Sequence, residues 1–555
     1  MLGFDEAAAK VTAPGQVFET AEALIDGASY RVFVNAPPTL RDLFGALRAH
    51  GRRPFLVYGH ERWSFAKVAA RVDALAAALA SLGVGKGERV AIAMRNLPEW
   101  VVAFGAALCA GAVAVPLNAW WTGEELGSVL ADCGATVLVA DQERVARTRA
   151  VLGATAVRAT VAARWGRSAV PQGVQLLEDL TREPPPAAAT PSLSPDDDAL
   201  LLYTSGTSGP PKGVLSTHRA VLQALLAFGC AAAIAEERRP GADEGGARVF
   251  ILVVPLFHAT GCIPVLLACT AMGYKLVMMR KWDPEAALAL IERERVTNFV
   301  GVPTQTLDLM ASPRLGDFDV SSLRSVGGGG APTPPSLVRQ VAARIASGQP
   351  AAGYGLTETN AYGPTISGDD YLARPASTGR TVPIMDVEVR DPAGRALPPG
   401  QRGEIWFRGP NLMRCYWNRP EETAATLVGG WLRTGDAGHL DAEGYLYVDD
   451  RLKDLVVRGG ENVSCAEVEA AIHEHPAVRE VAVLGLSHER LGEEVAAVVR
   501  LHPGASLDPD ELRSFLSARL AAYKIPSRVA MVTDELPRGA TGKVRKDALR
   551  GRFDA

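Results

Sequence analysis

The stretch from residue 199 to residue 213 constrains the fold most, because an apolar strand there runs directly into a loop of hydroxyls and glycines. The loop reads Thr204-Ser-Gly-Thr-Ser-Gly-Pro-Pro-Lys212. Glycines let backbone N–H groups approach phosphate oxygens, hydroxyls add hydrogen-bond donors, and the lysine supplies a positive charge. The sequence therefore predicts a polyphosphate-binding loop at the end of a buried strand.

This loop differs from a Walker A motif, which carries Gly-Lys-Ser/Thr at the start of a helix. Here Lys212 lies between Pro211 and Gly213, so the lysine is presented differently. A flexible Ser/Gly linker is the alternative interpretation. Linkers are seldom preceded by a buried strand or closed by Pro-Pro-Lys, so we favour nucleotide binding.

Length and composition predict an ordinary protein of several domains. The chain has 555 residues, of which 48% are hydrophobic. A chain of this length is too long for a single hydrophobic core and is expected to divide into several domains. Its formal net charge of −4 gives no reason to expect a nucleic-acid partner. Seven cysteines without a CxxC pair favour a reducing compartment over a disulfide framework.

Two apolar runs, 101–117 and 249–274, have the length to be compared with membrane spans. Glycine and proline interrupt both, which fits buried strand-loop-helix elements better than a lipid-facing helix. The first residues include an early acidic pair and no basic region followed by an apolar one, so they do not resemble a secretion signal. We expect a cytoplasmic protein without a transmembrane segment.

Helical and strand patterns alternate after an N-terminal extension, residues 1–38, in which we expect no regular pattern. Ser64 is a candidate cap for a helix that ends near Gly83, and residues 89–94 read as a strand. Residues 96–109 read as a helix, followed by strands at 112–117 and 135–140. This alternation predicts an α/β fold, with a large N-terminal domain of parallel-rich sheets covered by helices.

A charged cluster at 449–454 separates two apolar strands and marks a domain boundary. Beyond it, a helix at 465–473, strands at 480–486 and 495–501, a helix at 509–521 and a strand at 528–533 predict a small, mobile α+β domain. We therefore divide the chain into the extension, a large domain at 39–450, a hinge at 451–454 and a small C-terminal domain at 455–555. The Pro-rich residues 183–195 read as an exposed connection.

Further motifs follow the phosphate loop in a fixed order and cover nearly the whole chain. They are Gly353-Tyr-Gly-Leu-Thr-Glu358, Gly403-Glu-Ile-Trp-Phe-Arg-Gly409, Thr434-Gly-Asp436, Asp450-Arg-Leu-Lys-Asp454, Arg458-Gly-Gly-Glu-Asn-Val463 and Thr541-Gly-Lys543. In this combination the chain resembles the acyl-adenylate-forming enzymes, the superfamily of acyl-CoA synthetases, luciferases and stand-alone adenylation domains. It departs from the family pattern at Ser208, where threonine is commoner, and at Ser464-Cys465, where an aromatic-proline pair is frequent.

The resemblance implies an ATP site. Tyr354 would stack on adenine with Gly328-Gly-Gly-Ala-Pro332 on the other side, Asp436 and Arg451 would bind the ribose, and Glu358 would hold Mg²⁺. Each fragment also has a plain structural interpretation: the glycine run as a turn, Asp436 as a turn residue, Glu358 as a helix-start carboxylate. The implied ATP-binding residues are Thr204, Ser205, Gly206, Thr207, Ser208, Gly209, Lys212, Gly329, Gly330, Ala331, Pro332, Gly353, Tyr354, Gly355, Thr357, Asp436, Arg451 and Lys543.

The resemblance also implies how the two domains share the chemistry. Lys543 would bridge the acid carboxylate and the α-phosphate and neutralise charge in the transition state, although a solvated lysine in a basic tail is the alternative. Lys453 would be the hinge, on which the small domain rotates between two steps. The implied catalytic residues are Thr204, His258, Glu358 and Lys543, the acid-pocket residues are Phe257, His258, Gly301, Thr304 and Gly329, and the CoA-binding residues are Arg458, Gly459, Gly460 and Glu461.

The predicted function is an ATP- and Mg²⁺-dependent carboxylic acid:CoA ligase that works through an acyl-AMP. We expect a medium- to long-chain fatty acid as the substrate, with an aryl or ring-containing acid as the alternative. An amide synthetase, a carrier-protein loader and an adenylate-oxidising luciferase stay open, and a non-catalytic sensor is disfavoured because Glu358 and Lys543 are present. A homodimer is possible, but Trp120 and Trp121 are expected in the core rather than at an interface.

Overall fold

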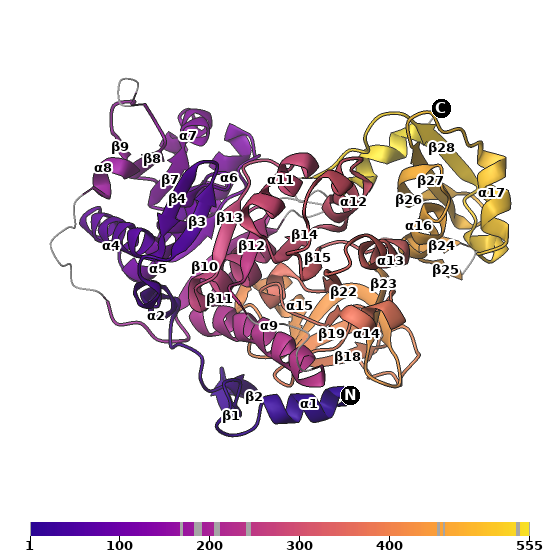
Figure 1. The fold of residues 1–555 in the computed structure, drawn as a ribbon, viewed down its shortest axis with the longest axis horizontal. Helices are drawn as coiled ribbons and strands as arrows, with labels where there is room; N and C mark the ends of the chain where they lie inside the picture. Colours follow the sequence, from indigo (N-terminus) through magenta and orange to yellow (C-terminus); the bar gives the residue numbers. More distant parts are fainter. Residues whose placement is uncertain are drawn as a thin grey trace.

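The computed structural model describes residues 2–166, 170–182, 191–204, 211–239, 246–451, 455–458, 461–539 and 544–553, with the backbone alone at residues 451, 457, 461 and 462. The predicted α/β class is confirmed: parallel-rich sheets are covered by helices, and a separate C-terminal sheet lies at one end of the molecule (Figure 1). The hinge residue Lys453, the connection at 183–190 and the loop residues 205–210 lie outside the described residues.

The first large sheet has the order β20-β11-β10-β6-β5-β7-β8-β9, and the strands from β10 to β9 are parallel. Its strands are β5 (Arg89–Ala93), β6 (Val113–Pro116), β7 (Val137–Asp141), β8 (Ala159–Ala163), β9 (Val174–Leu176), β10 (Asp198–Thr204), β11 (Lys212–Thr217) and β20 (Cys415–Tyr416). The helices of this half are α4 (Phe65–Ser81), α5 (Pro98–Ala110), α6 (Gly123–Cys133), α7 (Gln142–Thr148) and α8 (Leu177–Leu180).

The second large sheet has the order β17-β16-β15-β14-β12-β13-β3-β4, with antiparallel strands only at its two edges. Its strands are β3 (Pro54–Tyr58), β4 (Glu61–Ser64), β12 (Val249–Leu252), β13 (Lys275–Met278), β14 (Asn298–Gly301), β15 (Ser325–Gly329), β16 (Gln349–Gly353) and β17 (Thr365–Ser367). Its helices are α10 (Ala268–Met272), α11 (Pro284–Glu294), α12 (Pro303–Ala311), α13 (Pro335–Arg344) and α14 (Gly368–Ala373). The short helices α2 (Leu40–Gly45) and α3 (Leu47–His50) pack on α5 and α4.

Two antiparallel-rich sheets complete the fold. The third sheet joins β18 (Asp386–Arg390), β19 (Gly403–Arg408), β21 (Leu427–Val428), β22 (Trp431–Leu440) and β23 (Leu446–Arg451), with α15 (Pro420–Thr426) beside it. The C-terminal sheet joins β24 (Val456–Arg458), β25 (Glu461–Val463), β26 (Val478–His488), β27 (Gly492–Leu501) and β28 (Arg528–Val532), with α16 (Cys465–His473) and α17 (Pro509–Ser517). The elements predicted for the small domain are therefore confirmed, although its boundary stays a prediction.

The N-terminal extension is more regular than the sequence suggested. It forms α1 (Phe4–Val11) and a hairpin of β1 (Thr20–Ile25) and β2 (Ala28–Phe33), and α1 lies beside α9 (His218–Arg238) (Figure 1). The expectation of no regular pattern was wrong because α1 is amphipathic over only two turns, with Ala7 and Ala8 as its buried residues. The Asp5 carboxylate and the Arg380 guanidinium, 2.6 Å apart, connect the extension to the segment between α14 and β18.

Among the described residues, α9 is the one helix long and apolar enough to cross a membrane by length and composition. Half of its most apolar window is buried within the fold. The core helix of a globular domain has the same properties, and α9 packs against α1 and β11. The two apolar runs of the sequence, 101–117 and 249–274, do not form a helix of this kind.

The main core surrounds α5, whose residues are buried on nearly every side. Trp100 and Phe104 of α5 stack with ring centroids 5.0 Å apart, and both are fully buried. The predicted cap of α4 is also present, since Ser64 Oγ accepts a hydrogen bond from the Lys67 N–H at 3.2 Å. Truncating a buried aromatic such as Trp100 to alanine typically lowers the free energy of unfolding by about 3–5 kcal/mol.

His218 at the start of α9 makes stability depend on pH. Its ring is buried, and Nδ1 accepts a hydrogen bond from the Leu40 N–H at 3.2 Å. Burial lowers the pKa of His218 to about 4, against about 6.5 in an unfolded chain. Between these values the unfolded chain binds more protons, so the free energy of unfolding falls as the pH falls.

We expect the wild type to lose about 3 kcal/mol from this group between pH 6.5 and pH 4. Urea unfolding of wild type and His218→Asn across that range should show a difference that shrinks with falling pH. His60→Asn, a change of an exposed histidine, is the matched control. A constant difference between wild type and His218→Asn would contradict the assignment of a neutral, accepting imidazole.

Candidate active site

Most of the predicted site residues that the structure describes lie at one edge of the second large sheet. Parallel strands present their carboxyl ends at the same edge, where α/β proteins bind their ligands. Tyr354 follows β16, Gly330 follows β15, Thr304 follows β14, and Phe257 follows β12 after a short loop. Residues implied for adenine and for the acid are thus brought together by topology.

The glycines of β15 have a structural role of their own. A Cβ at Gly328 would lie 1.8 Å from the Gly301 carbonyl oxygen, and one at Gly329 would lie 2.3 Å from the Gly353 carbonyl oxygen. Any side chain there would collide with the neighbouring backbone of β14 or β16. The sequence predicts that the glycine run forms a surface for adenine. Close packing of β15 against β14 and β16 is a second, independent reason why these positions are glycine.

Tyr354 and Asp436, implied for adenine and ribose, are in direct contact. The Tyr354 hydroxyl donates a hydrogen bond to Asp436 Oδ2, and Asp436 is only 5% exposed. Tyr354 also packs on Phe407 with ring centroids 5.7 Å apart. On the antiparallel neighbour β23, Arg451 lies opposite Asp436. A nucleoside could therefore meet an aromatic ring and a carboxylate held in fixed relative positions.

Glu358 and Lys212 are linked through Tyr416. The Tyr416 hydroxyl donates to Glu358 Oε1 at 2.7 Å, and Lys212 Nζ lies 5.2 Å from the centroid of the Tyr416 ring. Burial raises the pKa of Tyr416, and the Glu358 carboxylate raises it further, so the hydroxyl keeps its proton as a donor. The site therefore combines one carboxylate and one ammonium group around a phenol.

The turn after Glu358 has an unusual backbone. Asn360 and Ala361 both adopt positive φ, 54° and 68°, which L residues other than glycine rarely do. Asn360 Nδ2 donates to the Asn411 carbonyl at 3.0 Å, and Asn411 Nδ2 donates back to the Thr359 carbonyl at 3.1 Å. These buried amides compensate a left-handed turn that would otherwise cost about 1–2 kcal/mol per residue.

The ends of the predicted phosphate loop are described, but its central residues 205–210 are not. Thr204 and Lys212 face each other across the antiparallel pair β10 and β11, with Thr204 Oγ1 donating to the Lys212 carbonyl at 3.4 Å. The strand pairing therefore brings the two ends of the loop together. Outside the described residues lie the predicted site residues Ser205, Gly206, Thr207, Ser208, Gly209, Lys453, Gly459, Gly460 and Lys543.

In the small domain, the described residues flank the implied catalytic and CoA positions. Arg458 Nη1 donates to the Tyr523 carbonyl at 2.7 Å, and Arg458 lies opposite Glu461 in the β24–β25 pair. On the two sides of residue 543, Arg538 contacts Glu480 and Lys546 contacts Glu469, each at 2.9 Å. Both sides of the Lys543 segment are therefore anchored to the C-terminal domain.

The implied acid wall is formed by an aromatic cluster after β12. The rings of Phe257 and His258 lie 4.7 Å apart, and Trp120 meets Phe257 edge to face at 5.2 Å. A π-helical segment, Gly261–Leu267, follows, with Pro264 inside it. Proline lacks the N–H needed for a regular helix, and such segments often occur at functional sites.

Asn96 connects the two large sheets beside this wall. Its Nδ2 donates to the carbonyls of Val254 at 3.1 Å and Met279 at 3.3 Å, while its Oδ1 accepts from the Leu256 N–H at 2.9 Å. Asn96 follows β5 of the first sheet, whereas its three partners follow β12 and β13 of the second. One buried amide thus fixes the start of the segment that carries Phe257.

Three contributors to the site were missed in the sequence: Tyr416, Asn96 and Trp120. Tyr416 lies between motifs, and no local pattern distinguishes it. The core expectation holds for Trp121, which is buried, but was wrong for Trp120, which is 40% exposed. Trp121 packs into the core around β5, β6 and β7, whereas Trp120 lies at the surface.

Among the described residues, no group of three or more histidine, cysteine, aspartate or glutamate side chains is placed to hold a metal ion. Glu358 offers a carboxylate where the resemblance implies Mg²⁺. This donor set still fits, because Mg²⁺ typically takes one or two carboxylates and completes its shell with substrate phosphates and water.

Comparison with known proteins identifies the class. Residues 43–417 match the family model for AMP-binding enzymes, and residues 467–543 match the AMP-binding enzyme C-terminal domain. The chain belongs to the AMP-binding, adenylate-forming family. Within it, the chain is an AMP-forming acid–thiol ligase, an acyl-CoA synthetase that uses ATP, CoA and a small carboxylic acid.

Its curated relatives act on different acids. A feruloyl-CoA synthase of Amycolatopsis sp is 38% identical over 502 residues, which are 89% of this chain and 95% of that protein. An indoleacetate–CoA ligase of Aromatoleum aromaticum is 38% identical over 88% of this chain and 92% of its own length. A long-chain-fatty-acid–CoA ligase of Mycobacterium tuberculosis is 33% identical over 89% and 94%.

Solved structures agree with the fold. An anthranilate CoA ligase in complex with anthranoyl-AMP superimposes with a TM-score of 0.82 at 27% identity, covering 93% of this chain and 97% of that one. An amide bond synthetase of Marinactinospora thermotolerans gives a TM-score of 0.81 at 30% identity, covering 92% and 99%. The predicted family, fold class and ligase activity are thereby confirmed, and the acid is left open.

Proposed function

We propose that the acid is an aryl or ring-containing carboxylic acid, ahead of the fatty acid expected from the sequence. The observation that carries the proposal is the aromatic cluster of Trp120, Phe257 and His258 at the carboxyl end of β12. Edge-to-face contacts suit planar rings, and each well-placed ring pair contributes about 0.5–1.5 kcal/mol beyond its buried area. The feruloyl and indoleacetate ligases, at 38% identity against 33% for the fatty-acid ligase, support the same choice.

The residues divide the two half-reactions between them in this proposal. Tyr354 and Asp436 hold the nucleoside, Lys212 and Thr204 hold the phosphates, and Lys543 bridges the acid and the α-phosphate. A carboxylate oxygen attacks the α-phosphorus, and the bond to pyrophosphate breaks. The CoA sulfur then attacks the acyl carbonyl, and AMP leaves.

Mg²⁺ belongs to the proposal as well. Glu358 would hold the ion, with Tyr416 orienting the carboxylate through its hydroxyl. The bound ion supplies charge neutralisation at the phosphates and orients the pyrophosphate leaving group. The proposal has three further parts. Rotation of the small domain about Lys453 rests on the family resemblance. A cytoplasmic location rests on composition, and a homodimer is proposed without a structural observation.

A pair of substitutions tests the metal assignment. Glu358→Gln removes the charge at nearly the same volume, and we expect about a 10²-fold lower rate of acyl-AMP formation, with a higher Mg²⁺ concentration needed for half-maximal rate. Tyr416→Phe removes the hydroxyl that hydrogen-bonds to Glu358 and should lower the rate of acyl-AMP formation about tenfold. Mg²⁺ titrations of pyrophosphate release measure both. An unchanged Mg²⁺ requirement in Glu358→Gln would contradict the assignment.

The substrate is tested by comparing kcat/KM for hydroxycinnamic and arylacetic acids with kcat/KM for saturated fatty acids of graded length, at saturating ATP and CoA. The proposal expects an aryl acid to exceed every fatty acid by at least about tenfold, a ratio that a few apolar contacts supply. A fatty acid as the better substrate would overturn the aryl proposal and restore the original expectation.

A further inference from the structure

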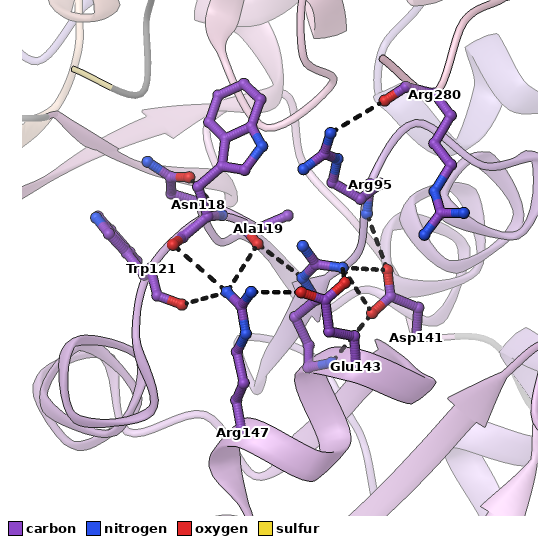
Figure 2. Close-up of polar contacts among 10 residues, drawn as sticks. Arg95, Asn118, Ala119, Trp121, Asp141, Glu143, Arg147 and Arg280 are labelled. Carbon is purple, nitrogen blue, oxygen red and sulfur yellow. Dashed lines mark hydrogen bonds and ion pairs between the residues drawn. The ribbon is translucent and has the colours of Figure 1, made fainter. Parts of the chain in front are cut away.

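The loop at residues 118–121 is held in place by two arginines of α7. Arg144 Nε donates to the Ala119 carbonyl at 2.7 Å, and Arg147 Nη1 donates to the Trp120 carbonyl at 3.4 Å. Arg147 Nη1 also donates to the Trp121 carbonyl at 2.8 Å (Figure 2). The Arg144 side chain is only 1% exposed. Three successive carbonyls of one loop are therefore fixed by charged donors.

Acidic partners keep these arginines in position. Arg144 pairs with Asp141 at 3.1 Å and with Glu143 at 2.9 Å, and Arg147 pairs with Glu143 (Figure 2). Burying a guanidinium is costly unless its donors are satisfied, so these carboxylates and the Ala119 carbonyl stabilise the buried Arg144 side chain. The loop backbone that it holds is correspondingly rigid.

This rigid loop presents an exposed tryptophan. The Trp120 side chain is exposed, at 40% for the residue, but its backbone N–H donates to Asn118 Oδ1 at 2.9 Å and its ring is contacted from two directions. Arg95 lies over the ring with its guanidinium carbon 5.1 Å from the centroid, and Phe257 meets it edge to face at 5.2 Å. A ring that only filled the core would be buried, as Trp121 is.

The same cluster also orients Arg95. Asp141 Oδ2 accepts the Arg95 backbone N–H at 3.2 Å, while Arg95 Nη2 donates to the Arg280 carbonyl at 3.3 Å (Figure 2). Asp141 thus connects the arginines that hold the loop with the arginine that covers Trp120. The loop at 118–121, the Trp120 ring and the Arg95 guanidinium therefore form one connected unit beside Phe257.

We propose that Trp120 determines specificity by fixing the position of Phe257, and that Arg144 and Arg147 are positioning residues for Trp120. This inference rests on the proposed function, because it takes Phe257 as part of the acid-binding wall. With Trp120 in place, Phe257 cannot turn away from the substrate, and the wall limits the width of the acyl group. The unit therefore selects among ring-containing acids by their bulk.

The test compares two acids that differ in width, 3-phenylpropanoic acid and 3-(2-naphthyl)propanoic acid. In Trp120→Ala we expect the ratio of kcat/KM for the naphthyl acid to that for the phenyl acid to rise at least about tenfold. Trp120→Phe keeps a ring against Phe257 and should stay within about threefold of the wild-type ratio. Arg147→Met should raise the ratio in the same direction but less, whereas Arg314→Met, which alters an exposed ion pair elsewhere, should leave it unchanged.

The ratio separates this role from a purely structural one, because loss of folded enzyme lowers both values equally. An unchanged ratio in an active Trp120→Ala enzyme would overturn the inference and leave the aryl proposal intact. If Trp120→Ala does not fold, Trp120→Leu replaces it and is expected to raise the ratio. Wild-type enzyme that converts fatty acids but neither propanoic acid would instead overturn the proposed function, and this inference with it.

Discussion

Lys543→Ala should lower the rate of acyl-AMP formation by about 10²–10³-fold, the usual effect of removing one group that stabilises transition-state charge. The thioester step starts from an adenylate already formed, so conversion of supplied acyl-AMP and CoA to acyl-CoA should continue at a rate near that of the wild type. Single-turnover measurements of each half-reaction give both rates. The two half-reactions should respond differently because Lys543 is assigned to acyl-AMP formation alone.

The control for this prediction is a nearby basic residue with a structural contact. Arg545 pairs with Asp547 on the surface at 2.7 Å, and Arg545→Ala should change neither half-reaction more than about twofold. Undiminished adenylation in Lys543→Ala would refute its role. An equal loss in both half-reactions would indicate damage to the small domain instead.

Arg144→Met should lower the free energy of unfolding by about 3–5 kcal/mol, because it leaves the carboxylate of Asp141 buried without its cation. The chain offers a matched control. Arg182 and Asp179 form an ion pair with the same three-residue spacing, but their side chains are 59% and 41% exposed. Arg182→Met should therefore change the free energy of unfolding by less than about 0.5 kcal/mol.

Denaturant unfolding of the two variants measures this difference directly. Adding Asp141→Asn to Arg144→Met removes the uncompensated charge while an amide oxygen can still cap α7, so the double variant should regain part of the loss. If Arg144→Met and Arg182→Met lowered the free energy of unfolding equally, burial would not determine how much each ion pair contributes to stability. The loop-holding role of Arg144 would then lose its energetic basis.

Features that depend on neighbouring residues in the sequence could be predicted. The cap of α4 at Ser64 and the helix at 465–473 follow from local patterns, and both are present as expected. The apolar strand before the predicted phosphate loop also required only local information, and it is present as β10, which pairs with β11. The order of the motifs along the chain then identified the family, because each motif is a short run of neighbouring residues.

Contacts between distant segments could not be predicted. Tyr416 is 58 residues from Glu358, and Asn96 reaches carbonyls 158 and 183 residues away. Neither has a local signature, because a tyrosine in a short strand and an asparagine after a strand are common. Trp120 and Trp121 are adjacent and chemically identical, and only the packing of the loop on α7 decides which one is exposed. The N-terminal helix was missed for a related reason, since its buried residues are two alanines.

The measurement that tests the central claim most directly uses a substrate acid labelled with oxygen-18 in its carboxylate, together with ATP and CoA. If the enzyme first forms an acyl-AMP and then a thioester, AMP should carry one labelled oxygen for each acyl-CoA produced, and pyrophosphate should carry none. Mass spectrometry of the separated products gives the answer. Label in inorganic phosphate with ADP as the product, or acyl-CoA formed alongside unlabelled AMP, would contradict the account.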